Sequence, residues 1–238
     1  MSEPSRPESR NRDVPQPNGS AARAGGHTVT AVLDPATRGL VRVALELADG
    51  SEARLGERMA EARQAGTPDL WLEELLISGV VFLGFPRALV AMAEFRRLVP
   101  EPSAGAEVPD YERWSEWRTR GETTCRTVYG KHYGFLRRNV RALHPALEEW
   151  MIVDGYGKTL GRPGLDLVRR ELCSVGMLVP QRVPRQLLAH LRGALNVGAT
   201  SEQLEELLDL AGDATAAPDA VTVARDLWRE LHDTLRHN

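Results

Sequence analysis

The chain has 238 residues, enough for one large or two small domains with a buried core. Its 30 Lys and Arg against 33 Asp and Glu give a net charge of −3, which favours neither a nucleic acid nor another polyanion as partner. The two cysteines, Cys125 and Cys173, are far apart and have no metal-ligand spacing, so we expect no bound metal and a reducing, cytoplasmic location.

Residues 1–27 are rich in Pro, Ser, Arg, Gly and Asn and contain almost no large apolar side chain. Such a segment cannot bury enough apolar surface to offset its ordering entropy, so we expect a disordered tail. It also lacks the apolar core of a signal peptide. The most apolar stretch of the chain, Leu75–Val90, is interrupted by glycine, proline and arginine, and we expect no membrane span.

Residues 28–100 are predicted to form a first helical module. Asp34 followed by Pro35 is typical of a helix start. Apolar residues then recur at helical spacing up to Asp49-Gly50. Further helices are expected over Arg54–Ala65, Pro68–Val81 and Arg87–Leu98, with Gly84-Phe85-Pro86 separating the last two.

Residues 101–164 are predicted to be a linker followed by a helical segment. Glu101–Val108 has the Pro, Gly and Ala content of a linker, and Asp110–Trp150 is predicted to be helical. The aromatic residues in the first half of that segment are expected to pack in a core or an interface; they are Trp114, Trp117, Tyr129, Tyr133 and Phe135. The glycines of Met151–Gly164 predict a loop or a broken helix.

Residues 165–238 are predicted to form a second helical module. Its centre is a helix, a short turn at Gly198 and a further helix within Leu187–Leu208. Thr200 and Gln203 form a capping box at the start of the later helix. His190 lies on the apolar stripe of the earlier helix, so we expect its imidazole to point inward.

The two modules resemble each other in sequence. Ala62–Leu76 aligns without a gap to Ala194–Leu208. The same register extends from Leu33 to Ala88, and every residue in it is separated from its match by the number of positions that separates Ala62 from Ala194. We call this separation the repeat offset. Since no strand-like alternation persists, we predict an all-α protein with two tandem helical modules packed into one unit. The position that matches His190 is Arg58, which suggests that one copy keeps a site while the other is scaffold.

His190 is the leading candidate for chemistry, because an imidazole titrates near neutral pH and can transfer protons. The alternative is a core histidine bonded to a backbone carbonyl. Glu171 borders the buried stripe of the preceding helix and is either an acid/base partner or a boundary carboxylate paired with Arg170 or Arg192. Asp154 could orient an imidazole or act as an acid, or simply form a turn.

Arg162 and Arg192 are candidates to bind a substrate carboxylate. Cys173 lacks a CxxC partner, and we interpret it as a free thiol in the core. The sequence contains no phosphate loop, dinucleotide fingerprint, nucleophile elbow or zinc-ligand spacing, so we expect no cofactor.

Several segments resemble the carboxymuconolactone decarboxylase family, which shares its fold with alkylhydroperoxidase-D-like proteins. They are Val128–Leu136, Glu149–Gly164, Arg162–Leu178 and Leu187–Leu208. The resemblance covers about Trp114–Leu235, and the first module is similar to a degenerate second copy.

The resemblance implies a helical module that assembles into trimers or hexamers, so a chain with two copies is expected to form a homotrimer. It implies cofactor-free decarboxylation of a small carboxylated lactone, as in aromatic-compound catabolism, or a related lyase or isomerase reaction. The motif histidine of the family falls on His190, and its acidic residue falls near Asp154.

Two other functions stay open. One is a non-catalytic, oligomeric or ligand-binding role, which the degenerate first copy favours. The other is hydroperoxide reduction, but the peroxidase branch uses a CxxC pair that this sequence lacks. Only Cys173 or Cys125 could carry that chemistry here.

Overall fold

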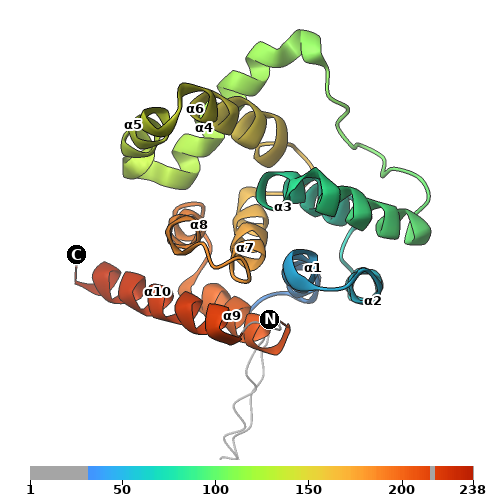
Figure 1. The fold of residues 1–238 in the computed structure, drawn as a ribbon. Coiled ribbons are helices and arrows are strands. Elements are labelled where there is room, and N and C mark those ends of the chain that lie inside the picture. Colours follow the sequence, from blue (N-terminus) through green and yellow to red (C-terminus); the bar gives the residue numbers. More distant parts are fainter. Residues whose placement is uncertain (1–31, 215–217, 238) are drawn as a thin grey trace, which may run out of the picture. The chain divides into compact units, whose positions relative to one another are not determined.

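The computed structural model describes residues 32–214 and 218–237, so the tail predicted at 1–27 lies outside the described residues. Within these ranges every regular element is a helix, which confirms the all-α prediction (Figure 1). The α-helices are α1 (Pro35–Asp49), α2 (Glu52–Gln64), α3 (Asp69–Leu98), α4 (Trp114–Tyr129), α5 (Tyr133–Leu143), α6 (Pro145–Trp150), α7 (Leu167–Leu178), α8 (Pro184–Asn196), α9 (Ser201–Ala214) and α10 (Pro218–Arg236). Two 3₁₀ turns, η1 (Tyr111–Arg113) and η2 (Gly130–His132), and a π-helix, η3 (Met151–Leu160), complete the order.

Two helical hairpins, α1–α2 and α7–α8, have the same local design. Asp34 caps α1 by accepting a hydrogen bond from the Thr37 backbone N–H, and Asp166 caps α7 by accepting one from Arg169. The first residues of α1, α2 and α3 are separated from those of α7, α8 and α9, respectively, by the repeat offset. Gly66 after α2 and Gly198 after α8 both have positive φ, 91° and 108°, which glycine adopts without steric cost.

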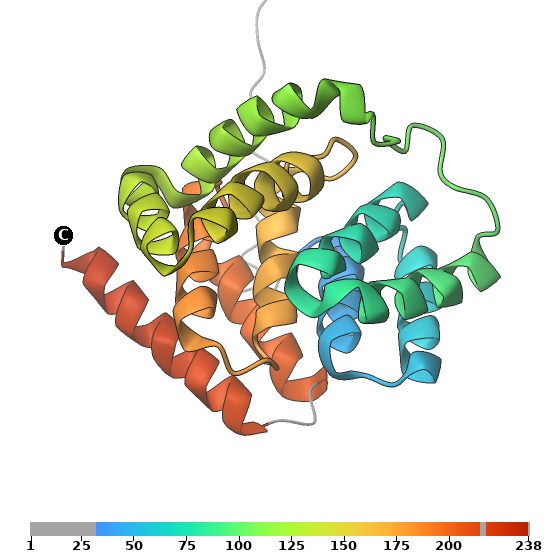
Figure 2. The same cartoon turned by 45° about the horizontal axis from the view of Figure 1, so that its top comes forward.

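The two hairpins pack against each other through α1 and α7, which lie side by side in both views (Figures 1 and 2). Ion pairs cross this contact in a reciprocal way. Arg38 of α1 binds Glu206 of α9, and Arg170 of α7 binds Glu74 of α3. The two arginines match each other at the repeat offset, and so do the two glutamates.

The apolar stretch Leu75–Val90, for which we expected no membrane span, lies within the long helix α3. Of the helices that the structure describes, α3 alone is long and apolar enough to cross a membrane by length and composition, with a mean hydropathy of 2.0 in its most apolar window. Its backbone is nevertheless broken at Gly84 (φ 79°, ψ 167°), just before Pro86, as the sequence predicts. Its first half also carries two buried carboxylates, Glu73 and Glu74.

The segment between the hairpins packs α4 tightly against η3. A Cβ on Gly121 would lie 2.0 Å from the Ile152 carbonyl oxygen, and a Cβ on Gly157 would lie 2.0 Å from that of Trp117. The two backbones therefore touch where each has a glycine. We predicted a loop or a broken helix over Met151–Gly164. Most of this segment is instead the π-helix η3.

The aromatic side chains of this segment only partly follow the packing prediction. Trp117 and Tyr133 are buried, whereas Trp114 and Phe135 are exposed on the surface.

Candidate functional site

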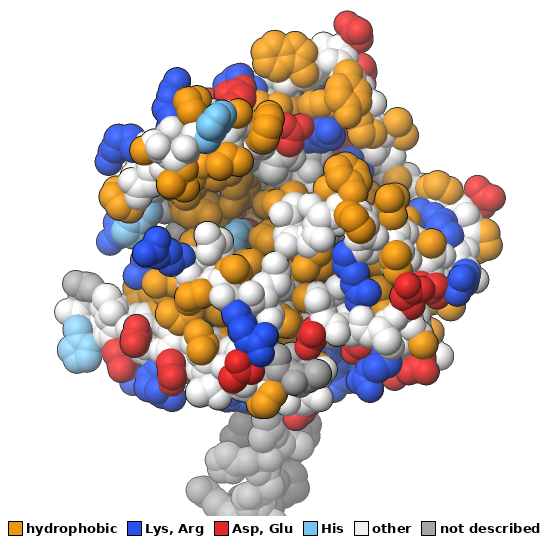
Figure 3. Space-filling view, in the orientation of Figure 1, with side chains coloured by type: hydrophobic (Ala, Val, Ile, Leu, Met, Phe, Trp, Pro, Cys, Tyr) orange, Lys and Arg blue, Asp and Glu red, His pale blue; other side chains and the backbone are white. Residues whose placement is uncertain are grey.

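A pocket of about 770 Å³ opens between α3, the end of α4, η3 and α8. Figure 3 shows a hollow in this region whose walls are hydrophobic side chains. Its apolar lining consists of Val80, Val81, Phe82, Phe85, Leu147, Trp150, Met151, Leu160, Leu178 and Val183. Its polar lining includes Tyr129, Asp154, Tyr156, Lys158, Thr159, Gln181, Gln186 and His190. A few polar groups in a mostly apolar cavity are typical of a small-molecule site.

His190 and Glu171 form a buried pair at this pocket. The Nδ1 atom of His190, on α8, lies 2.8 Å from Oε2 of Glu171, on α7. Their side chains are 9% and 2% exposed. A carboxylate on Nδ1 fixes the tautomer and ring orientation, and leaves Nε2 as the ring nitrogen available to a ligand.

Gly193 makes room for this pair. It lies one turn after His190, and a Cβ there would lie 2.6 Å from Oε2 of Glu171 and 2.7 Å from Cγ1 of Val128. The absence of a side chain at this position lets the Glu171 carboxylate reach the imidazole. Glu171 thus lies against the imidazole, and among the described contacts it bonds to neither Arg170 nor Arg192.

Aromatic rings surround the imidazole. The ring centroids of Phe82 and Tyr129 lie 5.4 and 6.4 Å from that of His190, both edge-to-face. Tyr129 also packs edge-to-face on Tyr156, with the ring centroids 6.0 Å apart. Burial raises the pKa of Tyr129 and of Tyr156 well above the ordinary range, so both hydroxyls stay protonated.

Asp154 lines the same pocket, but its half-exposed carboxylate lies 3.5 Å from Nζ of Lys158. The structure therefore places Asp154 at the wall beside a cation rather than against the imidazole. Lys158 also packs over the rings of Tyr111 and Trp117.

The two arginines predicted to bind a carboxylate lie outside this pocket. Arg162 is buried and binds Glu74 at 3.0 Å, and also donates to the Glu107 carbonyl. Arg192 is exposed and lines a separate pocket with Lys131 and His132. Among the described residues, the cation that lines the His190 pocket is Lys158.

Sequence reasoning missed several lining residues. Tyr129 belonged to an aromatic group that the sequence assigns to packing, and Tyr156 and Lys158 lie in the segment predicted as a loop. Tyr156 and Lys158 flank Gly157, and Tyr129 lies on α4, the helix that Gly121 and Gly157 bring into close backbone contact with η3. That contact depends on which helices meet, which the sequence does not state.

Thiol chemistry is not supported at this site. Cys125 and Cys173 are both buried. Burial raises the pKa of Cys125 to about 12 and raises that of Cys173 as well. A reactive cysteine requires an accessible thiolate.

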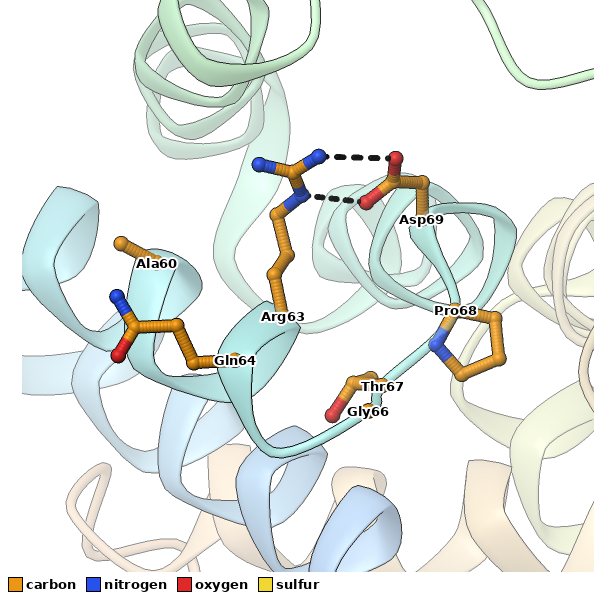
Figure 4. Close-up of a pocket in the computed structure, with 7 residues that line it drawn as sticks. All are labelled: Ala60, Arg63, Gln64, Gly66, Thr67, Pro68 and Asp69. Atoms are coloured by element: carbon orange, nitrogen blue, oxygen red, sulfur yellow. Dashed lines mark hydrogen bonds and ion pairs between the residues drawn. The ribbon is translucent and has the colours of Figure 1, made fainter.

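Another hollow lies at the turn between α2 and α3 (Figure 4). Its charged groups, Arg63 and Asp69, are bonded to each other at 2.6 Å. No imidazole or thiol lines it, so we assign it no chemistry. In the part of the chain that the structure describes, no group of His, Cys, Asp and Glu is arranged to hold a metal ion.

The sequence model of the carboxymuconolactone decarboxylase family matches residues 146–230, which contain both members of the His190–Glu171 pair. The chain contains a domain of this family. The match covers the hairpin α7–α8 and leaves out α1, α2 and α3. The duplication therefore stays a prediction.

Three relatives are similar to this chain. "Peroxisomal protein 2" of Schizosaccharomyces pombe is 27% identical over 183 residues, 76% of this chain and 86% of the relative. "Nitrosuccinic acid decarboxylase npaB" of Metarhizium robertsii is 31% identical over 87 residues, 37% of this chain and 58% of the relative. "4-carboxymuconolactone decarboxylase" of Acinetobacter baylyi is 25% identical over 104 residues, 42% of this chain and 78% of the relative. The cytoplasmic location predicted from the sequence stays a prediction.

Proposed function

We propose that the protein is a cofactor-free carboxy-lyase that acts on a small dicarboxylate, with His190 as the general acid/base. The observation that carries the proposal is the buried pair of His190 and Glu171 at the wall of an apolar pocket. The carboxylate holds the ring through Nδ1, so the other nitrogen can exchange a proton with a ligand.

The reaction follows from the chemistry of the two acids in the relatives' names, 4-carboxymuconolactone and nitrosuccinic acid. In each, the bond to the departing carboxylate breaks and its electron pair moves into a conjugated acceptor, a lactone carbonyl or a nitro group. CO₂ leaves, and a proton from the imidazole then reaches carbon. The apolar walls of the pocket exclude water from the departing carboxylate. An apolar environment destabilises the charge of this carboxylate, which favours its loss as neutral CO₂.

Lys158 is the proposed partner of the carboxylate that stays on the substrate. It replaces Arg162 and Arg192 in this role, because those two arginines lie elsewhere. The open volume of the pocket also supports an enzyme over a purely oligomeric role, since a small acid fits within about 770 Å³.

The test is release of CO₂ from 4-carboxymuconolactone and from nitrosuccinate, by wild type and by His190→Ala. We expect turnover of at least one acid and a loss of about 10²–10⁴-fold in the variant, the usual contribution of general acid/base catalysis. Glu171→Gln should show a smaller loss with the same sign. His132→Ala, an exposed histidine outside the pocket, is the matched control. Full activity of His190→Ala would overturn the assignment.

We also propose that the chain is a tandem duplication of one helical module. Three observations support it: the helix starts that match at the repeat offset, the paired aspartate caps, and the reciprocal ion pairs.

A homotrimer is proposed in turn, supported by exposed apolar side chains at Phe85, Leu147 and Trp150 beside the pocket. Light scattering that gives the molar mass of a single chain would overturn the trimer.

A further inference from the structure

We infer that Tyr129 is a catalytic hydrogen-bond donor of the His190 pocket, held in place by Tyr156. Its hydroxyl would stabilise the negative charge that decarboxylation moves onto the acceptor group of the substrate. The inference rests on the proposed function and adds a second kind of group to it. His190 and Glu171 handle the proton, and Tyr129 handles the charge.

Tyr129 stands where such a donor is needed. It is the last residue of α4 and lines the pocket. Its ring packs edge-to-face against the imidazole of His190. Because Tyr129 and His190 line the same pocket side by side, one bound ligand can contact both groups.

Tyr156 packs against Tyr129 and fixes its ring. Tyr156 is buried in η3, and its ring lies edge-to-face on that of Tyr129 with the centroids 6.0 Å apart. A phenol oxygen can accept one hydrogen bond while its own proton goes to another acceptor, so Tyr129 can meet Tyr156 and still donate to a ligand. The residue after Tyr156 is Gly157, where an added Cβ would lie 2.0 Å from the Trp117 carbonyl oxygen of α4. The two tyrosines are therefore fixed to each other by the glycine contact between α4 and η3.

The protonation of these hydroxyls suits a donor. Burial raises the pKa of both tyrosines, and the Glu171 carboxylate adds to the effect. The hydroxyls thus stay neutral over the pH range in which an imidazole titrates. Donors aimed at a developing charge in a site with little water are among the larger contributions to catalysis.

A π-helix at this position fits the same interpretation. π-helical turns are rare and occur frequently at functional sites. Here η3 supplies Tyr156 and Lys158 to the pocket wall, together with Met151 and Asp154.

The experiment compares Tyr129→Phe and Tyr156→Phe with wild type, using nitrosuccinate and 4-carboxymuconolactone. We expect Tyr129→Phe to lower kcat by about 10²-fold with little change in KM, as for removal of one donor to a developing oxyanion. Tyr156→Phe should lower kcat less, because it acts through Tyr129. Tyr133→Phe is the matched control: Tyr133 is buried in the same apolar cluster, and its hydroxyl bonds to Arg137 outside the pocket.

A binding measurement separates this inference from the proposed function. The nitronate of 3-nitropropanoate is the anion that remains when nitrosuccinate loses CO₂. Calorimetry should show that wild type and Tyr133→Phe bind it more tightly than Tyr129→Phe does, by about 10-fold or more. Equal affinities, or no binding by wild type, would overturn the role of Tyr129. Turnover that needs His190 but not Tyr129 would leave the proposed function intact and reject the inference.

Discussion

The hairpins α1–α2 and α7–α8 each bury one carboxylate, but they give it different partners. In α1–α2, Glu46 faces Arg54 and Arg58, with its oxygens 3.2 and 3.9 Å from their Nε atoms. In α7–α8, Glu171 faces His190. An arginine stays protonated in proteins, whereas a histidine gains and loses its proton near neutral pH. The same helical frame therefore supports a fixed ion pair in one hairpin and, in the other, the pair to which we assign proton transfer in our proposal.

Glycines explain how the two hairpins diverge. Gly39 of α1 matches Glu171 of α7 at the repeat offset, and Glu61 of α2 matches Gly193 of α8. A Cβ on Gly39 would lie 2.9 Å from Oγ1 of Thr67, so α1 and α2 pack closely and leave no space for a carboxylate there. In α7–α8 the glycine is on the second helix instead, and the space that it leaves holds Glu171.

The largest expected effect concerns the reciprocal ion pairs. Glu74 binds Arg170 and Arg162, with its own side chain 1% exposed, whereas Glu206 binds Arg38 at 18% exposure. Glu74→Gln leaves the buried guanidinium of Arg170 without its counter-charge, whereas Arg162 keeps the Glu107 carboxylate at 3.8 Å. The change should cost about 3–5 kcal/mol of the free energy of unfolding. Glu206→Gln should cost at most about 1 kcal/mol, because its pair is partly exposed to water.

Urea unfolding of both variants measures this difference. High salt should reduce the effect of Glu206→Gln and leave that of Glu74→Gln nearly unchanged, since buried pairs are screened less. Equal losses would mean that the two pairs, despite matching in sequence, do not differ in burial as the structure has them.

The sequence predicted the frame better than the site. The helix start at Asp34-Pro35, the break at Gly84 and the inward position of His190 all follow from local rules, namely caps, glycine conformations and the spacing of apolar residues. The role of Tyr129 did not, because aromatic spacing looks the same for packing as for a site.

The carboxylate-binding arginines show the same limit. Arg162 has the residue type that such a site needs, but Glu74, 88 residues earlier in the chain, binds it instead. Local sequence states which groups exist, and only the packing of distant helices states which of them meet.

A smaller effect is expected at the helical glycines. Gly193→Ala brings a Cβ to within 2.6 Å of the Glu171 carboxylate, so it should cost about 1–3 kcal/mol of stability and displace Glu171 from the imidazole. Gly56→Ala, in the second helix of the other hairpin, meets only Oε2 of Glu94 at 3.7 Å. Removing a glycine from a helix interior without a clash should stabilise the protein by about 0.5–1 kcal/mol.

Thermal unfolding and CO₂ release of the two variants test this pair. We expect Gly193→Ala to lose activity along with stability, and Gly56→Ala to keep full activity. A Gly193→Ala variant with wild-type activity would contradict the view that Gly193 sets the distance between Glu171 and His190.

The smallest effect should be the same in both hairpins. Asp34→Ala and Asp166→Ala each remove the cap of the first helix of a hairpin, at an expected cost of about 1 kcal/mol.

This cost should depend on pH. Although burial raises the pKa of each aspartate, the hydrogen bonds that Asp34 accepts from Thr37 and Asp166 from Arg169 outweigh this effect and lower the pKa overall. A lowered pKa contributes stability above the unfolded value near 4, and this contribution is lost as the pH falls through the folded-state pKa. The variants and wild type should therefore differ at pH 7 and converge below about pH 4. Chemical unfolding at both pH values measures this difference in the free energy of unfolding. A loss of stability in only one of the two variants would contradict the equivalence of the two helix starts.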